Sequence, residues 1–257
     1  SPDEFWAGQA DVAGFQQTPA GRDAARFKEP MGLAISKTTP SMLYVADAGN
    51  HAVRAIDLSL ASDATTDSVS TVVGRSTWLG VSPDGVSLAD ARLTRPVDVA
   101  IDDCGRFLVI VDEGSHRVYR VDLVQGTIET LIGNGQAFTA VANSAGETSI
   151  DTPVAVRYDS DGNLYVASKE SVLVVQLPEG CTPSCGVQAN ICTADKASPV
   201  RQIYGSHPRT SYPASATRCL SDLDIVEEAG NSVEIAFTDR CRGLMVQLSR
   251  CQAGSCK

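Results

Sequence analysis

Short apolar runs recur along the chain and are separated by turn residues. The first set covers Gly32 to Ile35, Leu43 to Asp47 and Val53 to Leu58. Runs of four to eight residues with alternating or continuous apolar character predict β-strands, and no stretch has a comparably strong helical period. A fourth run follows in three of the sets and ends in glycine, at Gly74, Gly133 and Gly205. The pattern predicts an all-β protein with no helix longer than about two turns.

These sets of runs are copies of one repeat. The copies begin at Pro30, Pro96, Pro153 and Ser221, so that their starts lie 66, 57 and 68 residues apart. This spacing is too long for a helical solenoid unit and is typical of a four-stranded sheet with generous loops. The fourth copy is the most degenerate, since it keeps little beyond "IAFTD".

The first copy contains "LYVADAGNHAVRAIDL", and the second contains "LVIVDEGSHRVYRVDL". The third contains "GNLYVAS" but lacks the "GNH" turn. These motifs resemble those of the NHL-repeat β-propeller family, and the resemblance covers nearly the whole chain outside the loops. It implies that each copy is one blade of a β-propeller. We expect blades at about residues 27–74, 93–133, 150–205 and 219–251.

The segment "EFWAG", residues 4–8, has the form of an outermost strand but precedes every blade. The fourth copy has only "SRCQAGSCK" after its third strand, so residues 4–8 can pair there and close the ring. We therefore expect residues 1–257 to form a single four-bladed propeller domain. The alternative is a fragment of a larger ring or of a longer ectodomain, because members of the family more commonly have six blades.

The chain has an even number of cysteines, most of them in its last third: Cys104, Cys181, Cys185, Cys192, Cys219, Cys241, Cys251 and Cys256. This usage predicts disulfides and an oxidising compartment. The competing interpretation is a zinc site, but the spacing of Cys181, Cys185 and Cys192 lacks a second pair of ligands. The chain contains no Asn-x-Ser/Thr acceptor and no signal peptide at its start, so a secreted protein would already have lost its signal.

The direction of the strands predicts one disulfide in particular. Cys219 precedes the first strand of the fourth copy, and Cys241 follows the second, so both lie at one end of that sheet. The other six cysteines fall towards the opposite end, and a bridge requires Cα atoms within roughly 7 Å of each other. We therefore expect Cys219 to pair with Cys241. The other six would pair among themselves, within residues 181–192, within residues 251–256, and from Cys104 to the 181–192 insertion.

The charge of the chain excludes one class of partner. The net charge is −10 and the isoelectric point is about 4.7, so the average surface repels phosphates and nucleic acid is not expected to bind. No apolar run approaches the roughly 18 to 20 residues that span a bilayer, so we expect no membrane span in this chain.

The turns between the second and third strands carry the candidate ligand-binding residues. Asn50 and His51 in the first copy correspond to Ser115 and His116 in the second, after the aspartates Asp47 and Asp112. A catalytic residue has no reason to recur once per blade. We therefore expect the aspartates to bond the backbone of the turn, and each histidine to pack or bond within its own turn. Contact with a ligand is the alternative, and the corresponding turns of the later copies add Lys169, Glu170 and Arg240 as candidates.

Catalytic and metal sites have little support in the sequence. A zinc site of the kind found in the peptidylglycine amidating lyase would need His51, His116 and the loop residue His207 to converge. Asp159 and Asp161 superficially suggest a calcium loop, but they fall where the repeat requires a tight hairpin and lack the distal glutamate. No catalytic residue, metal ligand or cofactor is therefore expected.

The loops leading into the blades are long and are the expected site of function. Gly8 and Phe27 are 19 residues apart, as are Gly74 and Leu93, and 17 residues separate Gly133 from Ile150. Long loops without strand character are often functional, although these loops could instead pack on each other and cap the channel. We expect a secreted or surface-exposed, non-catalytic scaffold that binds a protein or other macromolecule. The alternative is a metal-dependent lyase or hydrolase-type propeller enzyme that uses the central channel.

Overall fold

The computed structural model describes residues 7–8, 12–15, 21–60, 68–177, 194–205, 220–228, 232–239, 244–252 and 255–256. In this part of the chain, every helix is a 3-10 helix of three residues: η1 (Arg22–Ala24), η2 (Ala48–Asn50), η3 (Glu113–Ser115) and η4 (Ala145–Glu147). All other regular structure is β-strand. The all-β prediction is confirmed.

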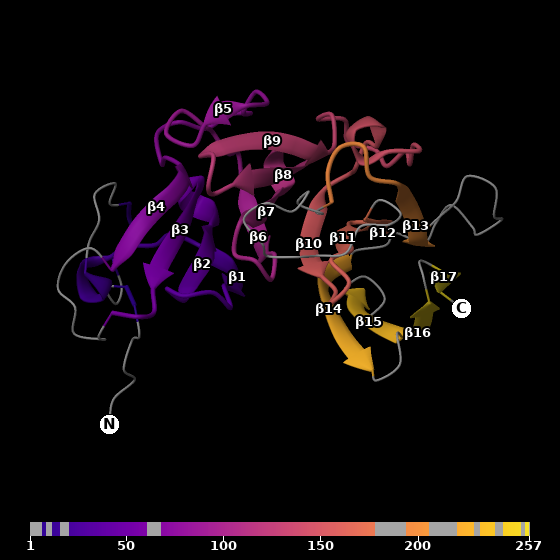
Figure 1. Cartoon of the computed structure of the whole chain (residues 1–257). Helices are drawn as coiled ribbons and strands as arrows, with labels where there is room; N and C mark the ends of the chain where they lie inside the picture. Colours follow the sequence, from indigo (N-terminus) through magenta and orange to yellow (C-terminus); the bar gives the residue numbers. More distant parts are fainter. Residues whose placement is uncertain are drawn as a thin grey trace. The chain divides into compact units, whose positions relative to one another are not determined.

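The strands form four antiparallel sheets that follow the four sequence repeats (Figure 1). The first sheet contains β1 (Pro30–Ile35), β2 (Met42–Asp47), β3 (Ala52–Asp57) and β4 (Val69–Gly74). The second contains β6 (Pro96–Ile101), β7 (Phe107–Asp112), β8 (Arg117–Asp122) and β9 (Thr127–Ile132), with the short β5 (Val86–Ser87) added beside β9. Sequential strands are neighbours in each sheet, as expected of propeller blades.

The third and fourth sheets follow the same order. The third contains β10 (Pro153–Tyr158), β11 (Leu164–Ser168), β12 (Ser171–Val175) and β13 (Val200–Gly205). The fourth contains β14 (Leu220–Glu228), β15 (Ser232–Asp239), β16 (Leu244–Gln252) and β17 (Ser255–Cys256). The predicted strand positions agree with these bounds to within a few residues.

The chain divides into two compact units. One comprises residues 1–115 and 121–129, and the other comprises residues 116–120 and 130–257. The division passes through the second sheet, because β8 and β9 contribute residues to both units. The expectation of a single domain stays a prediction.

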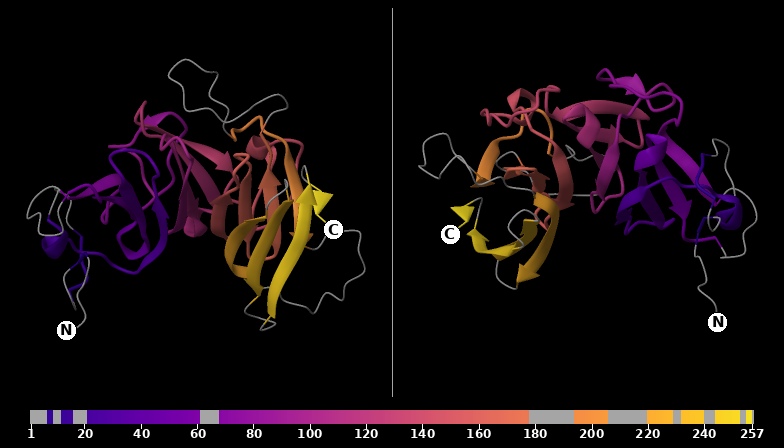
Figure 2. Two further views of the ribbon diagram at one scale, coloured as in Figure 1. Left: turned by 60° about the horizontal axis from the view of Figure 1, so that its bottom comes forward. Right: turned by 180° about the vertical axis from the view of Figure 1, so that it is seen from behind.

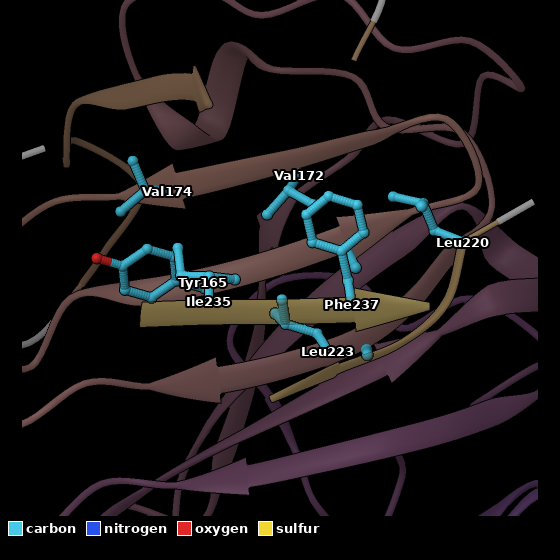
Figure 3. Packing of buried hydrophobic residues seen from close by; sticks show 9 residues of the cluster. Tyr165, Val172, Val174, Leu220, Leu223, Ile235 and Phe237 are labelled. Carbon is cyan, nitrogen blue, oxygen red and sulfur yellow. The ribbon is translucent and has the colours of Figure 1, made fainter. Parts of the chain in front are cut away.

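In the first unit, β6 lies beside β1 and β2, so the inner strand of one sheet packs on the preceding sheet. The second unit repeats this arrangement, with β14 beside β10 and β11. Figure 3 shows the resulting core: Leu223 and Phe237 of the fourth sheet pack against Tyr165, Val172 and Val174 of the third. Burial of these side chains stabilises the contact between the sheets, at about 25 cal/mol for each Å² of apolar surface removed from water.

The outer edge of the fourth sheet differs from the prediction. The sequence pattern gave this sheet no outer strand of its own, but β17 pairs with the end of β16, near the C-terminus in Figure 2. The sequence pattern missed β17 because it contains only two residues, too few to show an alternation of apolar and polar side chains.

The N-terminal segment "EFWAG" can be placed only in part, because Glu4 to Trp6 lie outside the described residues. Ala7 and Gly8 do not belong to a strand. Ala7 packs against buried side chains of the first unit, including Val45 and Ile56, and the Gly8 N–H donates to the Arg22 carbonyl. These two residues are therefore bound to the first unit, and closure of a ring by residues 4–8 stays a prediction.

Candidate functional site

The turn after β2 is built around the buried carboxylate of Asp47. This carboxylate accepts hydrogen bonds from the Lys28 backbone N–H at 2.7 Å and from the Asn50 amide at 2.8 Å. It also faces the guanidinium of Arg54 at 3.6 Å, and both side chains of this ion pair are fully buried. Arg54 in turn lies over the rings of Phe15 and Phe27. Asp47 therefore joins the turn to the loop that enters the sheet.

Asp112 repeats this arrangement in the second sheet. It accepts from the backbone N–H groups of Thr94, at 2.9 Å, and Arg95, and from the Ser115 hydroxyl at 2.8 Å. We expected the two aspartates to bond the backbone of their own turns, and the structure corrects which backbone they bond. The backbone donors belong to the loops that precede the sheets, and the turns contribute side-chain donors.

Burial raises the pKa of Asp47 and of Asp112. Hydrogen bonds from the turn and the entering loop act in the opposite direction, because they stabilise the ionised carboxylate. Buried carboxylates with shifted pKa values often mark catalytic sites. Here each carboxylate is occupied by donors from its own sheet and loop, and this arrangement favours a structural role.

Each histidine bonds to the loop that leads into the following sheet. The His51 ring contacts the Thr94 carbonyl through Nδ1, so this nitrogen carries the proton. The His116 Nδ1 instead accepts from the Thr152 N–H at 3.0 Å and lies 3.4 Å from a carboxylate oxygen of Asp151. The expectation that each histidine packs or bonds within its own turn is therefore corrected for the side chains, although the His51 backbone N–H does donate to the Ala48 carbonyl of its turn. The direction of the two bonds differs because a carbonyl faces one ring and an N–H faces the other.

Both histidines adopt the left-handed backbone conformation, with φ of 53° for His51 and 52° for His116. This conformation is uncommon for residues other than glycine. It turns each histidine carbonyl towards the end of the fourth run, where a Cβ on Gly74 would lie 2.1 Å from the His51 oxygen. A Cβ on Gly133 would lie 2.2 Å from the His116 oxygen. Gly74 and Gly133 are therefore required by the histidine turns beside them.

The first four candidate ligand-binding residues contribute to the architecture. Asn50 is buried, and its amide donates to the Gly14 carbonyl at 2.6 Å as well as to Asp47. Ser115 is buried against Asp112. His51 and His116 are half-buried and use Nδ1 as described above. These contacts favour the architectural interpretation of the repeated turn over contact with a ligand.

The later candidates have different surroundings. Lys169 and Glu170 form a two-residue connection between β11 and β12, as the shorter repeat predicts. Backbone groups of Lys169 bond to Thr152 and Leu220. The Glu170 side chain is exposed. Arg240 lies outside the described residues, as does His207.

Asp159 forms the hairpin that the repeat predicts. Its carboxylate accepts from the Asn163 N–H at 2.8 Å and from the Asn163 amide at 2.9 Å, and the Gly162 N–H donates to its carbonyl. Burial raises the pKa of Asp159. Among the residues that the structure describes, no group of three or more His, Cys, Asp or Glu side chains could hold a metal ion.

The long loops have buried ends and exposed middles. Ala25, Ala91, Leu93 and Ile150, which end the loops before β1, β6 and β10, are buried. Between Gly74 and Leu93, the side chains of Trp78, Leu79 and Val81 are exposed, and Arg75 and Arg92 lie over the Trp78 ring. The ends of the loops therefore contribute to the core, whereas the middle of the Gly74–Leu93 loop presents apolar and cationic groups to solvent.

The corresponding loop of the second unit, between Gly133 and Ile150, borders a groove of about 760 Å³. Its lining includes residues 137–143 of the loop, Asp151, Glu170 and Arg201. Phe138 and Val141 are exposed on the loop side. The groove thus combines one exposed aromatic ring with both signs of charge, and its volume lies in the range of binding pockets. Among the residues predicted from the sequence, Glu170 alone contributes to its lining.

Comparison with known proteins also indicates a β-propeller. No family model matches the sequence. Residues of this chain are 27% identical over 165 positions to Protein SUPPRESSOR OF QUENCHING 1, chloroplastic, of Arabidopsis thaliana, covering 64% of the chain and 15% of that protein. They are 26% identical over 206 positions to NHL repeat-containing protein 2 of Gallus gallus, covering 70% of the chain and 27% of that protein. The match thus spans less than a third of either relative.

Among solved structures, the Dos1 propeller superimposes with a TM-score of 0.51 at 8% identity. This match covers 92% of the chain and 48% of that structure, and it concerns the fold alone. The repeated four-stranded antiparallel sheets, together with the structural similarity to this propeller, define a β-propeller fold. The resemblance to NHL-repeat propellers, first seen in the turn motifs, is confirmed.

Proposed function

We propose that this protein is a non-catalytic scaffold that binds a protein partner through the loops leading into its second and third sheets. One observation carries the proposal: each of these loops presents an aromatic side chain to solvent, Trp78 at 40% exposure and Phe138 at 51%. Large aromatic side chains are usually buried, and exposed ones beside arginine are typical of the residues that dominate protein interfaces.

The surroundings of the two rings support this function. Trp78 lies under Arg75 and Arg92 at 4.8 and 5.2 Å from the ring centre, and these contacts hold the ring in place before any partner arrives. Phe138 borders the groove that also contains Arg201 and Glu170. Side chains that are already ordered lose little entropy on binding.

The experiment is affinity capture from an extract of the source with Trp78→Ala, Phe138→Ala and the control Val124→Ala. Val124 is exposed in the turn between β8 and β9, and it is not among the residues described as contacting the Trp78 ring or lining the groove beside Phe138. Each aromatic substitution should lower capture of a specific partner by about 30-fold, the effect of a 2 kcal/mol interface residue, whereas Val124→Ala should leave it unchanged. Equal capture by all four proteins would contradict the proposal.

We further propose that the scaffold works outside the cell, as a secreted protein or cell-surface ectodomain stabilised by disulfides. Cys104, the cysteine whose side chain the structure describes, is not a free thiol. Cys251 and Cys256 are direct partners across β16 and β17, which supports a bridge between them because opposite Cα atoms lie about 4.5 to 5.5 Å apart. Cys219 and Cys241 lie outside the described residues, but Leu220, which follows Cys219, and Asp239, two residues before Cys241, are paired at one end of the fourth sheet.

Peptide mapping without reduction tests the pairing. We expect Cys219 joined to Cys241, Cys251 joined to Cys256, and Cys104 joined to a cysteine of residues 181–192. The Cys219–Cys241 bridge would close a loop of about 20 residues and stabilise the fold by about 3 kcal/mol. A bridge from Cys219 to any of the other six cysteines, or eight free thiols in the natural protein, would overturn this part of the proposal.

A further inference from the structure

The loop between β4 and β6, which includes β5 (Figure 1), holds two arginines against one tryptophan. The guanidinium carbons of Arg75 and Arg92 lie 4.8 and 5.2 Å from the centre of the Trp78 ring. The Trp78 N–H donates to the Arg75 carbonyl, and the Arg75 guanidinium donates to the Ala89 carbonyl, each at 3.0 Å. The Ser82 hydroxyl bonds to the N–H and the carbonyl of Arg92, at 2.7 Å in both cases. The loop therefore fixes the backbone at both arginines and brings two positive charges to one aromatic ring.

The loop before the first sheet repeats part of this framework. Gly14 corresponds to Gly80 and Arg26 to Arg92, and each pair is 66 residues apart. A Cβ on either glycine would lie 3.2 Å from the Cδ of its arginine. Each glycine N–H also donates, at 3.3 Å, to the carbonyl of the residue that follows the arginine. The glycine and this arginine therefore belong to the common architecture of the two loops.

The tryptophan and the other arginine are specific to the second loop. At the same spacing of 66 residues, the first loop has Val12 in place of Trp78 and Gln9 in place of Arg75. Val12 is half-buried, whereas Trp78 is 40% exposed. The shared contacts thus form without a tryptophan or an arginine at these positions. The architecture of the loop does not explain these two residues, whereas a ligand that binds at this surface would.

The charges of the two arginines are not balanced within the described part of the chain. Neither Arg75 nor Arg92 forms an ion pair there, whereas other arginines do so with a carboxylate: Arg54, Arg95 and Arg106. Asp90, two residues before Arg92, accepts instead from the Ser87 hydroxyl at 2.8 Å. A guanidinium that stacks on a ring keeps N–H donors in its own plane, and these donors match the two oxygens of a carboxylate. On a chain of net charge −10, such a site attracts acidic groups locally.

We propose that Arg75, Trp78 and Arg92 form a binding site for an acidic side chain of the protein partner. The occupant would be a short segment of that partner in which glutamate or aspartate stands beside apolar residues. Its carboxylate would accept from the guanidinium groups, and its apolar residues would contact Leu79 and Val81, which are 56% and 46% exposed. This inference rests on the proposed scaffold function and names the chemistry that the scaffold recognises.

A sulfated glycan would also match two guanidinium groups, but the surroundings favour a peptide. The exposed side chains of Leu79 and Val81 adjoin the site in sequence, and they offer apolar contacts that a chain of sulfated sugars does not use. The net charge of −10 also repels a ligand that carries negative charge along its whole length. A peptide can present one carboxylate to the site and remain weakly charged elsewhere. A heparin oligosaccharide is therefore the probe for the alternative.

Fluorescence anisotropy of labelled hexapeptides tests the class of ligand. The probe alternates glutamate with leucine, and the matched peptides carry glutamine or lysine in place of glutamate. The glutamate peptide should bind the unsubstituted protein about tenfold more tightly than either matched peptide, because it alone forms hydrogen bonds between charged groups. Equal binding of the glutamine peptide, no saturable binding of the glutamate peptide, or tighter binding of the heparin oligosaccharide would overturn the proposal.

Substitutions of the two arginines locate the site. Arg75→Gln and Arg92→Gln should each weaken binding of the glutamate peptide by about tenfold. The control Lys37→Gln removes the same charge from an exposed lysine that pairs with Asp103 outside the loop, and should change the affinity by less than about twofold. Arg92→Lys keeps the charge of an exposed side chain, so it should lose less affinity than Arg92→Gln. Equal losses from Lys37→Gln and Arg92→Gln, or from Arg92→Lys and Arg92→Gln, would contradict recognition of a carboxylate here.

The capture experiment separates this inference from the proposed function. We expect Arg75→Gln and Arg92→Gln to capture less of the partner that Trp78→Ala fails to capture. If Trp78→Ala loses the partner while both glutamine variants capture it fully, the scaffold function stands and the acidic ligand is wrong. Full capture by Trp78→Ala and Phe138→Ala would instead refute the scaffold function, and the peptide measurement does not depend on that result.

Discussion

Replacing Asp47 with alanine is expected to lower the free energy of unfolding by about 3 to 5 kcal/mol. The change removes the carboxylate that faces the buried Arg54 guanidinium at 3.6 Å, and so takes the charge-balancing group away from a desolvated positive charge. It also removes the acceptor for the Lys28 N–H and for one bond of the Asn50 amide. Burial lowers the pKa of Arg54 but leaves the guanidinium charged at neutral pH, so it cannot escape the cost by losing its proton.

Equilibrium unfolding in urea measures this effect, with Asp90→Ala as the control. Asp90 is exposed, and its carboxylate accepts from the Ser87 hydroxyl in the loop before β6. The control should change the free energy of unfolding by no more than about 0.5 kcal/mol. A loss below about 1 kcal/mol for Asp47→Ala would show that the repeated carboxylate does not stabilise the sheet, and would reopen a role in binding.

Replacing Gly74 with alanine is expected to cost more than about 3 kcal/mol, because two effects combine. Gly74 has a φ of 85°, which an alanine adopts at a cost of about 1 to 3 kcal/mol. In addition, the new Cβ would lie 2.1 Å from the His51 carbonyl oxygen and 3.0 Å from the Ala52 Cα. Both neighbours are backbone atoms of the turn, so they cannot move aside without disturbing the bond between His51 and Thr94.

Gly126→Ala is the matched control for this change. Gly126 also has a positive φ, of 69°, but a Cβ there meets no atom within 4 Å. The control therefore isolates the conformational cost, about 1 to 2 kcal/mol, and the difference between the two variants measures the close approach of the histidine turn. Equal losses of stability in urea unfolding would mean that the turn yields to the new methyl group.

The fold was predictable because each repeat is locally consistent. Three apolar runs recur from copy to copy, and three of the copies add a fourth run that ends in glycine, so the copies support one another in predicting the same sheet. Gly74 and Gly133 illustrate this, since their position follows from the turn that carries His51 or His116. The two-residue strand β17 could not be predicted, because its pairing depends on a long-range contact with β16 rather than on its own pattern.

The candidate site was predictable only in part. Recurrence favoured a structural role for the aspartates and histidines of the turns, but their partners in the entering loops are distant in sequence and follow from the packing of sheets. Trp78 and Phe138 were missed as individual residues. The sequence did contain a signal for them. Each is an aromatic residue in a long loop without the alternation of a strand, so the repeat assigns it no position in the core.

Photo-cross-linking from the loops tests the proposed binding surface most directly. The amino acid p-benzoylphenylalanine replaces Leu79 or Val141, which are exposed beside the two aromatic rings, and Val124 in the control. In an extract of the source, positions 79 and 141 should form adducts with the same protein partner that Trp78→Ala and Phe138→Ala fail to capture. Adducts from position 124 alone, or none from either loop, would contradict a scaffold that binds through these loops.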